Sequence, residues 1–236
     1  QLKFGIYQNF GMNKALLQDL LLFKSVKNDK YVTLKEYVSA MPEDQKYIYY
    51  ATGKSVDSIK MMPQLDKITE KGFDVLCMTD DVDEFTVKSI NDYDSKQFRS
   101  ISGGDLGIDD DSAEDEYKEL ADFMKETLGD KVEKVRISTR IKNHPVCFTV
   151  EGDVSLEMEK VLNSMPNANG QIKAKKVLEV NSQSEVLKKL NGLFETDKEE
   201  AKELTVILYK LACIIEGMPI DNPTELTDSV CKFIAK

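Results

Sequence analysis

Four acidic residues stand close together in the first half of the chain, at Asp80, Asp81, Asp83 and Glu84. Carboxylates at this spacing could act as a general acid and base, or could bind a metal ion. They equally suit the first turn of a helix, because the positive end of the helix dipole favours negative charge. We expect a helix N-terminus here. The alternative is a stand-alone α/β enzyme that uses this carboxylate cluster.

The other residues that could do chemistry form no recognisable active site. The single histidine, His144, precedes Pro145 in an expected turn, and the spacing identifies no partner that would make it a general base. Gly103 and Gly104 are followed by Asp105 and not by the Lys-Ser/Thr pair of a phosphate-binding loop. We therefore expect no catalytic residue, no metal and no cofactor in this chain.

The acidic run and the cysteines also lack the spacing of a metal site. Residues 102–116 are rich in glycine and carboxylates but do not follow the ligand pattern of an EF-hand, so we expect a solvated linker. The cysteines stand far apart without a Cys-x-x-Cys pair, which indicates small core residues in a reducing compartment. They are Cys77, Cys147, Cys213 and Cys231.

The segment 154–165 predicts an amphipathic helix with an apolar stripe on one face and Leu156 roughly opposite. Such a helix can pack on its own domain with one side and leave the other side available. Methionines in the stripe suit varied apolar partners, because the thioether side chain is flexible. The alternative is an ordinary core stripe. The stripe consists of Val154, Met158, Val161, Leu162 and Met165.

Two further helices, at 197–216 and 223–235, carry more apolar surface than a short terminal helix can cover. Thr196 with Glu199, and Asn222 followed by Pro223, are the expected N-terminal caps. A second copy of the chain could cover this surface in a two-fold interface, or the chain's own sheet could bury it. The interface candidates are Leu204, Ile207, Leu208, Leu211, Ile214, Ile215, Leu226, Val230, Phe233 and Ile234.

The elements that position these residues predict two domains. The first half alternates strands and helices, with an apolar run at 15–23 that predicts a core helix, and this order favours an α/β unit with parallel strands. Residues 102–116 interrupt the pattern, which places a domain boundary near Ser112. The second half reads as an α+β domain that ends in three helices.

The bulk composition excludes several classes of protein. The chain has 236 residues, and its 32 basic and 42 acidic side chains give a net charge of −10. This charge disfavours nucleic-acid binding, which requires clustered positive charge. The longest apolar stretch, 204–215, contains Lys210 and is too short to span a membrane, and no signal peptide is visible. We expect a cytoplasmic protein and, because the sequence opens on Gln1, an excised segment.

Five long runs together resemble the bacterial HtpG form of the heat-shock protein 90 family, a group of stress-induced ATP-dependent chaperones. They read LLLFKS, YVTLKEYVSAMPEDQKYIYYATGKS, DVLCMTDDVDEF, KVRISTRIKNHPVCFTVEG and GMPIDNPTEL. The resemblance covers essentially the whole chain. It implies that residues 1–111 are the late part of an α/β middle domain and that residues 112–236 are an α+β domain with a C-terminal helical dimerisation bundle.

The resemblance also implies partners and sites. ATP and magnesium would belong to the full-length protein and not to this segment, which would not itself be an enzyme. The partners implied are a second copy, non-native client proteins and the bacterial DnaK chaperone system. The family dimerises through its last two helices, here 197–216 and 223–235. Clients would contact the 154–165 stripe together with Glu84, Phe85 and Lys88, although relatives can carry Trp in place of Phe85 and Asn in place of Lys88.

Overall fold

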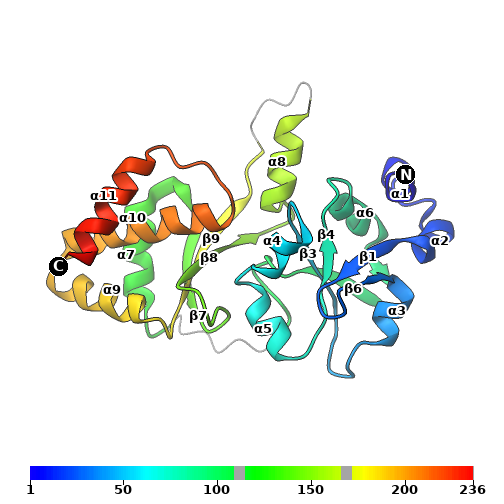
Figure 1. The fold of residues 1–236 in the computed structure, drawn as a ribbon, viewed down its shortest axis with the longest axis horizontal. Coiled ribbons are helices and arrows are strands. Elements are labelled where there is room, and N and C mark those ends of the chain that lie inside the picture. Colours follow the sequence, from blue (N-terminus) through cyan, green and yellow to red (C-terminus); the bar gives the residue numbers. More distant parts are fainter. Residues whose placement is uncertain (109–114, 166–171, 236) are drawn as a thin grey trace. The chain divides into compact units, whose positions relative to one another are not determined.

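The computed structural model describes residues 1–108, 115–165 and 172–235. It forms two compact units: residues 1–108 with 152–174, and residues 109–151 with 175–236. The segment 152–174 thus belongs to the first unit although it lies in sequence between two strands of the second (Figure 1). The predicted boundary near Ser112 lies outside the described residues, and the sequential division at 111/112 stays a prediction.

A six-stranded mixed sheet forms the centre of the first unit. Its strands are β1 (Leu22–Ser25), β2 (Tyr31–Thr33), β3 (Ile48–Thr52), β4 (Leu76–Met78), β5 (Asp92–Tyr93) and β6 (Lys96–Ser100). They lie in the order β2-β1-β4-β3-β6-β5. β3 runs parallel to β4 and β6, whereas the other neighbouring pairs are antiparallel. The predicted parallel strands of an α/β unit are therefore confirmed.

Helices cover both faces of this sheet and create two cores (Figure 1). Side chains alternate along β3, so Ile48 and Tyr50 enter one core and Tyr49 and Ala51 enter the other. The first core receives α1 (Leu2–Gln8), α3 (Leu34–Ser39) and α6 (Asp83–Ile90), and the second receives α4 (Val56–Lys60) and α5 (Leu65–Glu70). Burial on both faces explains why β3 and β4 are continuous apolar runs.

The predicted core helix at 15–23 is wrong. The run divides into a short helix α2 (Lys14–Leu17), a 3-10 turn η1 (Gln18–Leu20) and the strand β1. α2 has no buried residue. In β1, which pairs with β2 and β4, the burial alternates because Phe23 enters the first core whereas Leu22 on the other face is 50% exposed. Sheet pairing therefore overrides a local pattern that is compatible with a helix.

In its described residues, the second unit combines a three-stranded sheet with four helices. The strands β7 (Lys134–Ser138), β8 (Val146–Glu151) and β9 (Lys175–Asn181) lie in the order β7-β9-β8, with β9 parallel to β7 and antiparallel to β8. The helices are α7 (Lys118–Leu128), α9 (Glu185–Thr196), α10 (Lys198–Ile215) and α11 (Pro223–Ile234), and the 3-10 turn η2 (Gly129–Lys131) follows α7. α10 packs on the sheet, where Tyr209 meets Phe148 edge-on with ring centroids 5.6 Å apart. These contacts confirm mixed α and β structure that ends in helices.

The helix caps are largely as predicted, because they depend on a few neighbouring residues. Thr33 and Glu36 form the expected capping box of α3, and the Asn222 side chain accepts the Glu225 N–H at the start of α11. The expected box at Thr196 is displaced by one residue: Asp197 caps α10 by accepting the Glu200 N–H. Thr196 instead closes α9, where its hydroxyl donates to the Gly192 carbonyl.

Candidate functional site

The carboxylate cluster lies at the start of α6, as predicted. Asp83 is buried, and its Oδ2 accepts the N–H groups of Thr79 and Asp80 at 3.1 Å each. Its Oδ1 lies 2.5 Å from the Lys3 ammonium of α1. Burial raises the pKa of Asp83, and the Lys3 ion pair opposes this shift. Asp83 therefore secures the turn before α6 and links α6 to α1.

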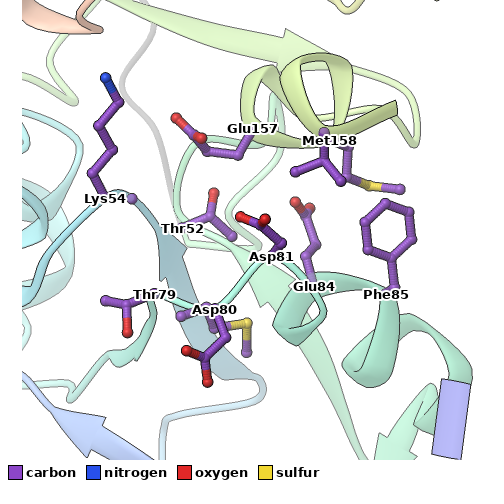
Figure 2. Close-up of a pocket in the computed structure, with 12 residues that line it drawn as sticks. Thr52, Lys54, Thr79, Asp80, Asp81, Glu84, Phe85, Glu157 and Met158 are labelled. Atoms are coloured by element: carbon purple, nitrogen blue, oxygen red, sulfur yellow. The ribbon is translucent and has the colours of Figure 1, made fainter. Parts of the chain in front are cut away.

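The four carboxylates do not all converge on one point, although Asp80 and Asp83 both contact the Lys3 ammonium. Figure 2 shows the Asp80 and Asp81 carboxylates pointing in opposite directions. Across residues 1–108, 115–165 and 172–235, no three His, Cys, Asp or Glu side chains come together as a metal site. The described residues therefore offer no metal-binding set to the enzyme alternative.

A thermal-shift experiment checks this reading of the carboxylates. We expect millimolar magnesium, calcium or manganese to leave the melting temperature of the chain unchanged, because the part of the chain that the structure describes holds no preformed set of ligands for such an ion. Asp81→Asn is the matched variant. A rise in melting temperature with the metal ion that is absent in Asp81→Asn would contradict our assignment and would support the enzyme alternative.

A pocket opens beside α6, where the ends of β3 and β4 meet the helix α8 (Leu156–Ser164) (Figure 2). All its walls belong to the first unit. Acidic side chains and apolar side chains share the lining, with Lys54 at one side (Figure 2). Its residues are Thr52, Gly53, Lys54, Met78, Thr79, Asp80, Asp81, Glu84, Phe85, Glu157, Met158 and Val161.

Glu84 lies on the inner side of α6 and makes only internal contacts among those described. Its side chain is 5% exposed, and its Oε2 accepts the Ser155 hydroxyl at 2.5 Å. Its Oε1 accepts the Tyr50 hydroxyl at 3.3 Å and lies 3.6 Å from the Lys88 ammonium. Burial, reinforced by Glu84, raises the pKa of Tyr50 well above its usual range, so the phenol stays a proton donor.

Phe85 and Lys88 bring α6 into contact with two other segments. The Lys88 ammonium donates to the Asp153 carbonyl and lies 3.0 Å from the Met158 sulfur. The Phe85 ring packs against Tyr7 of α1 with centroids 5.4 Å apart, and it lies beside Met158 in Figure 2. The structure thus brings together the two predicted groups, although 70 positions separate Lys88 from Met158.

The predicted stripe lies on the more exposed side of α8. Val154, Met158, Val161 and Leu162 are half-buried and Met165 is exposed, whereas Leu156 on the opposite side is buried. Ser155 caps the helix by accepting the Met158 N–H at 3.0 Å. Ser155 was not predicted as a site residue, although a serine directly before an apolar helical run is a recognisable capping signal.

The predicted interface residues fall into three classes of burial within a single chain. Leu204, Ile207, Leu208 and Leu226 are buried, and Leu211, Val230 and Phe233 are half-buried. The exposed members are Ile214, Ile215 and Ile234, at 53%, 40% and 79% exposure. One chain therefore hides part of the predicted set and leaves the C-terminal ends of α10 and α11 uncovered.

The structure also bears on the remaining candidates, which are His144, the four cysteines and the expected linker. His144 is exposed in the loop between β7 and β8, as expected for a turn residue. Cys77, Cys147 and Cys213 are buried, which confirms their assignment to the core, but Cys231 on α11 is exposed and the core assignment is wrong there. Part of the expected linker at 102–116 lies outside the described residues.

Comparison with known proteins adds independent information. A family model described as "Hsp90 protein" matches residues 1–236. "Chaperone protein HtpG" of Bacillus licheniformis is 50% identical over 242 residues, which cover 100% of this chain and 38% of that protein. The proteins of the same name from Clostridium botulinum and Bacillus subtilis are 52% and 51% identical over 241 residues, covering 99% of this chain and 38% of each relative. The chain thus spans 38% of the length of these curated relatives. Within the described residues, no helix is both long and apolar enough to cross a membrane.

Proposed function

The chain belongs to the Hsp90 protein family, and from this premise we propose that it supplies client-binding and homodimerisation surfaces to an ATP-dependent chaperone. The chain spans 38% of its relatives' length. In this proposal ATP and magnesium would bind in the remainder of the longer protein. The proposal places the chaperone in the cytoplasm. Its further partner would be the DnaK chaperone system.

One observation carries the client-binding proposal: α6 and α8 together present a partly exposed apolar surface next to charged side chains. Non-native proteins expose apolar segments that are normally buried, and a half-buried apolar surface can cover them without exposing a large patch to water in its free state. Two thioethers, Met158 and Met165, lie on this surface and adapt to differently shaped partners. Phe85 and Lys88 adjoin it from α6.

The homodimer proposal rests on the uncovered ends of α10 and α11. The two helices are antiparallel, with Lys232 2.8 Å from Glu203 and Lys210 3.4 Å from Glu225, so the exposed Ile214 and Ile215 lie at one end of the pair and the exposed Ile234 lies at the other. A two-fold axis would bring the same helix pair of a second chain against this one and could cover both ends. The dimer would then carry two client surfaces, which raises the affinity for a client that reaches both.

Client binding is tested by charging the stripe. The double variant Met158→Glu, Leu162→Glu is expected to raise the Kd for reduced, carboxymethylated α-lactalbumin, a permanently unfolded protein, by about tenfold or more, because two carboxylates would be desolvated on binding. Fluorescence anisotropy of the labelled client gives the Kd. Sedimentation of the same sample shows whether dimerisation is unchanged.

The matched control is Met61→Glu. Met61 is 71% exposed at the end of α4, outside the stripe, so this variant adds a carboxylate in place of an exposed methionine elsewhere in the same unit. It should bind the client like the unchanged chain. Equal affinity of all three proteins would show that the stripe is not the client site.

A further inference from the structure

We propose that Glu84 and Ser155 form a positioning pair that holds the start of α8 against α6 and thereby presents the apolar stripe. Glu84 is then a positioning residue and makes no contact with the client. This inference rests on the proposed client-binding function and specifies how that surface is built. Three features of the first unit carry it: the burial of both side chains, the presence of partners on both carboxylate oxygens, and the double role of the serine hydroxyl.

Glu84 lines the pocket beside α8 but is almost fully buried. Glu84 and Ser155 are 4% and 5% exposed, whereas Met158, Val161 and Leu162 on the same surface are half-buried. Both carboxylate oxygens already have partners, Oε1 with Tyr50 and Lys88 and Oε2 with Ser155. A client group could reach Glu84 only by displacing these contacts, and a carboxylate without them would be buried at a high cost.

The Ser155 hydroxyl connects α6 to α8. It donates its proton to Glu84 and accepts the Met158 N–H, which uses the donor and one acceptor position of a single oxygen. The first bond is charge-assisted and therefore stronger than a neutral one. The second satisfies one of the free N–H groups of the first turn of α8. Loss of either Glu84 or Ser155 removes the same connection.

Two further contacts fix this connection in place. Tyr50 on β3 is buried in the core and donates to Glu84, so the carboxylate is held by the sheet as well as by its own helix. Lys88, one turn along α6, donates to the carbonyl of Asp153, two residues before Ser155. The start of α8 is thus attached to α6 at two points, and the orientation of Met158 and Val161 follows from them.

A double-mutant cycle tests the pair. Glu84→Ala and Ser155→Ala should each raise the Kd for labelled, carboxymethylated α-lactalbumin by about tenfold, because each frees the first turn of α8. The Kd of the double variant should rise by less than the product of the two single effects, because the bond between Glu84 and Ser155 is already lost in either single variant. Ser155→Thr keeps the hydroxyl and the cap, so this variant should bind the client like the unchanged chain.

The controls are serines whose hydroxyls bond only within their own helix among the contacts described. Ser164→Ala on α8 removes a bond to the Val161 carbonyl, and Ser89→Ala on α6 removes a bond to the Phe85 carbonyl. Both should bind the client normally. Hydrogen exchange should quicken in α8 of the Glu84 and Ser155 variants but remain unchanged in β3 and β4, which shows that the unit is still folded.

Each other outcome overturns the inference. A weakened Glu84→Ala with a normal Ser155→Ala, or losses that multiply in the double variant, would mean that Glu84 touches the client directly. Normal binding by both single variants would show that the pair does not position the stripe. Failure of the client-binding proposal itself is distinguished by the stripe variant Met158→Glu, Leu162→Glu, which would then also bind normally.

Discussion

A chain that carries Ile214→Glu and Ile215→Glu is expected to sediment as a monomer at concentrations where the unchanged chain is a dimer. Both side chains are exposed at the end of α10 in a single chain, so their replacement should leave the fold intact. In the proposed dimer each glutamate would enter an apolar interface without a partner. Such an uncompensated charge costs about 3 kcal/mol or more, which raises the Kd of the dimer at least about a hundredfold.

Ile172→Glu provides the matched control. Ile172 is 39% exposed, nearly the same as Ile215 at 40%, but it lies in the first unit near α8. Analytical ultracentrifugation should show a dimer for this variant and a monomer for the α10 variant, with the same circular dichroism spectrum for both. A dimer that survives both glutamates would place the interface elsewhere, and a monomeric unchanged chain would end the dimer proposal.

The choice of these two positions follows from the structure and could not follow from the sequence. Along α10 apolar residues surround most of the helix, and periodicity alone does not separate those that face the chain's own core from those that face a partner. The structure buries Leu204, Ile207 and Leu208 within one chain. Charging any of these would test folding before it tested dimerisation.

The features that the sequence predicted well are local ones. The capping box of Thr33 with Glu36 and the Asn222 cap of α11 depend on residues within one turn, and both are present. The short apolar run that became β4 was recognisable because glycine punctuation limits its length and a buried parallel strand lacks polar alternation. The amphipathic pattern of α8 is likewise a local feature. Its single buried residue is Leu156, which lies opposite the stripe as predicted.

The features that the sequence could not predict depend on residues far apart in the chain. The run at 15–23 looks helical by composition, but only its end joins a strand, because residues 22–25 pair with strands that include β4, about fifty positions later. The same holds for the candidate site. The carboxylate cluster was correctly expected at a helix N-terminus, but the partners of its last member are Tyr50 on β3 and Ser155 before α8. No periodicity within α6 distinguishes a buried Glu84 from an exposed one.

A buried ion cluster in the second unit also depends on residues that lie far apart in the chain. Glu179, in the middle of β9, is fully buried and accepts the hydroxyls of Ser138 at 2.6 Å and Thr149 at 3.1 Å. Its carboxylate oxygens lie 3.5 Å from Nε of Arg140 and 3.8 Å from Nη1 of Arg136. A carboxylate at the centre of a small sheet thus joins β7, β8 and the segment after β7.

Glu179→Ala is expected to destabilise the second unit by about 3–5 kcal/mol, because two nearly buried guanidinium groups would lose the carboxylate that balances them. Native-state hydrogen exchange, followed by mass spectrometry of peptides from β9, reports the opening free energy of this unit separately from the first.

Glu151→Ala is the matched control: Glu151 lies 3.7 Å from the same Arg136, but its side chain is 36% exposed, so its loss should cost about 1 kcal/mol or less. If the two variants lost the same free energy of unfolding, the burial of Glu179 would not add to the cost of losing its ion pairs, and the prediction would be wrong. A large loss of opening free energy in Glu179→Ala alone would mean that the sheet beneath α10 depends on one buried carboxylate. The helix that carries the proposed dimer surface would then be supported by this carboxylate.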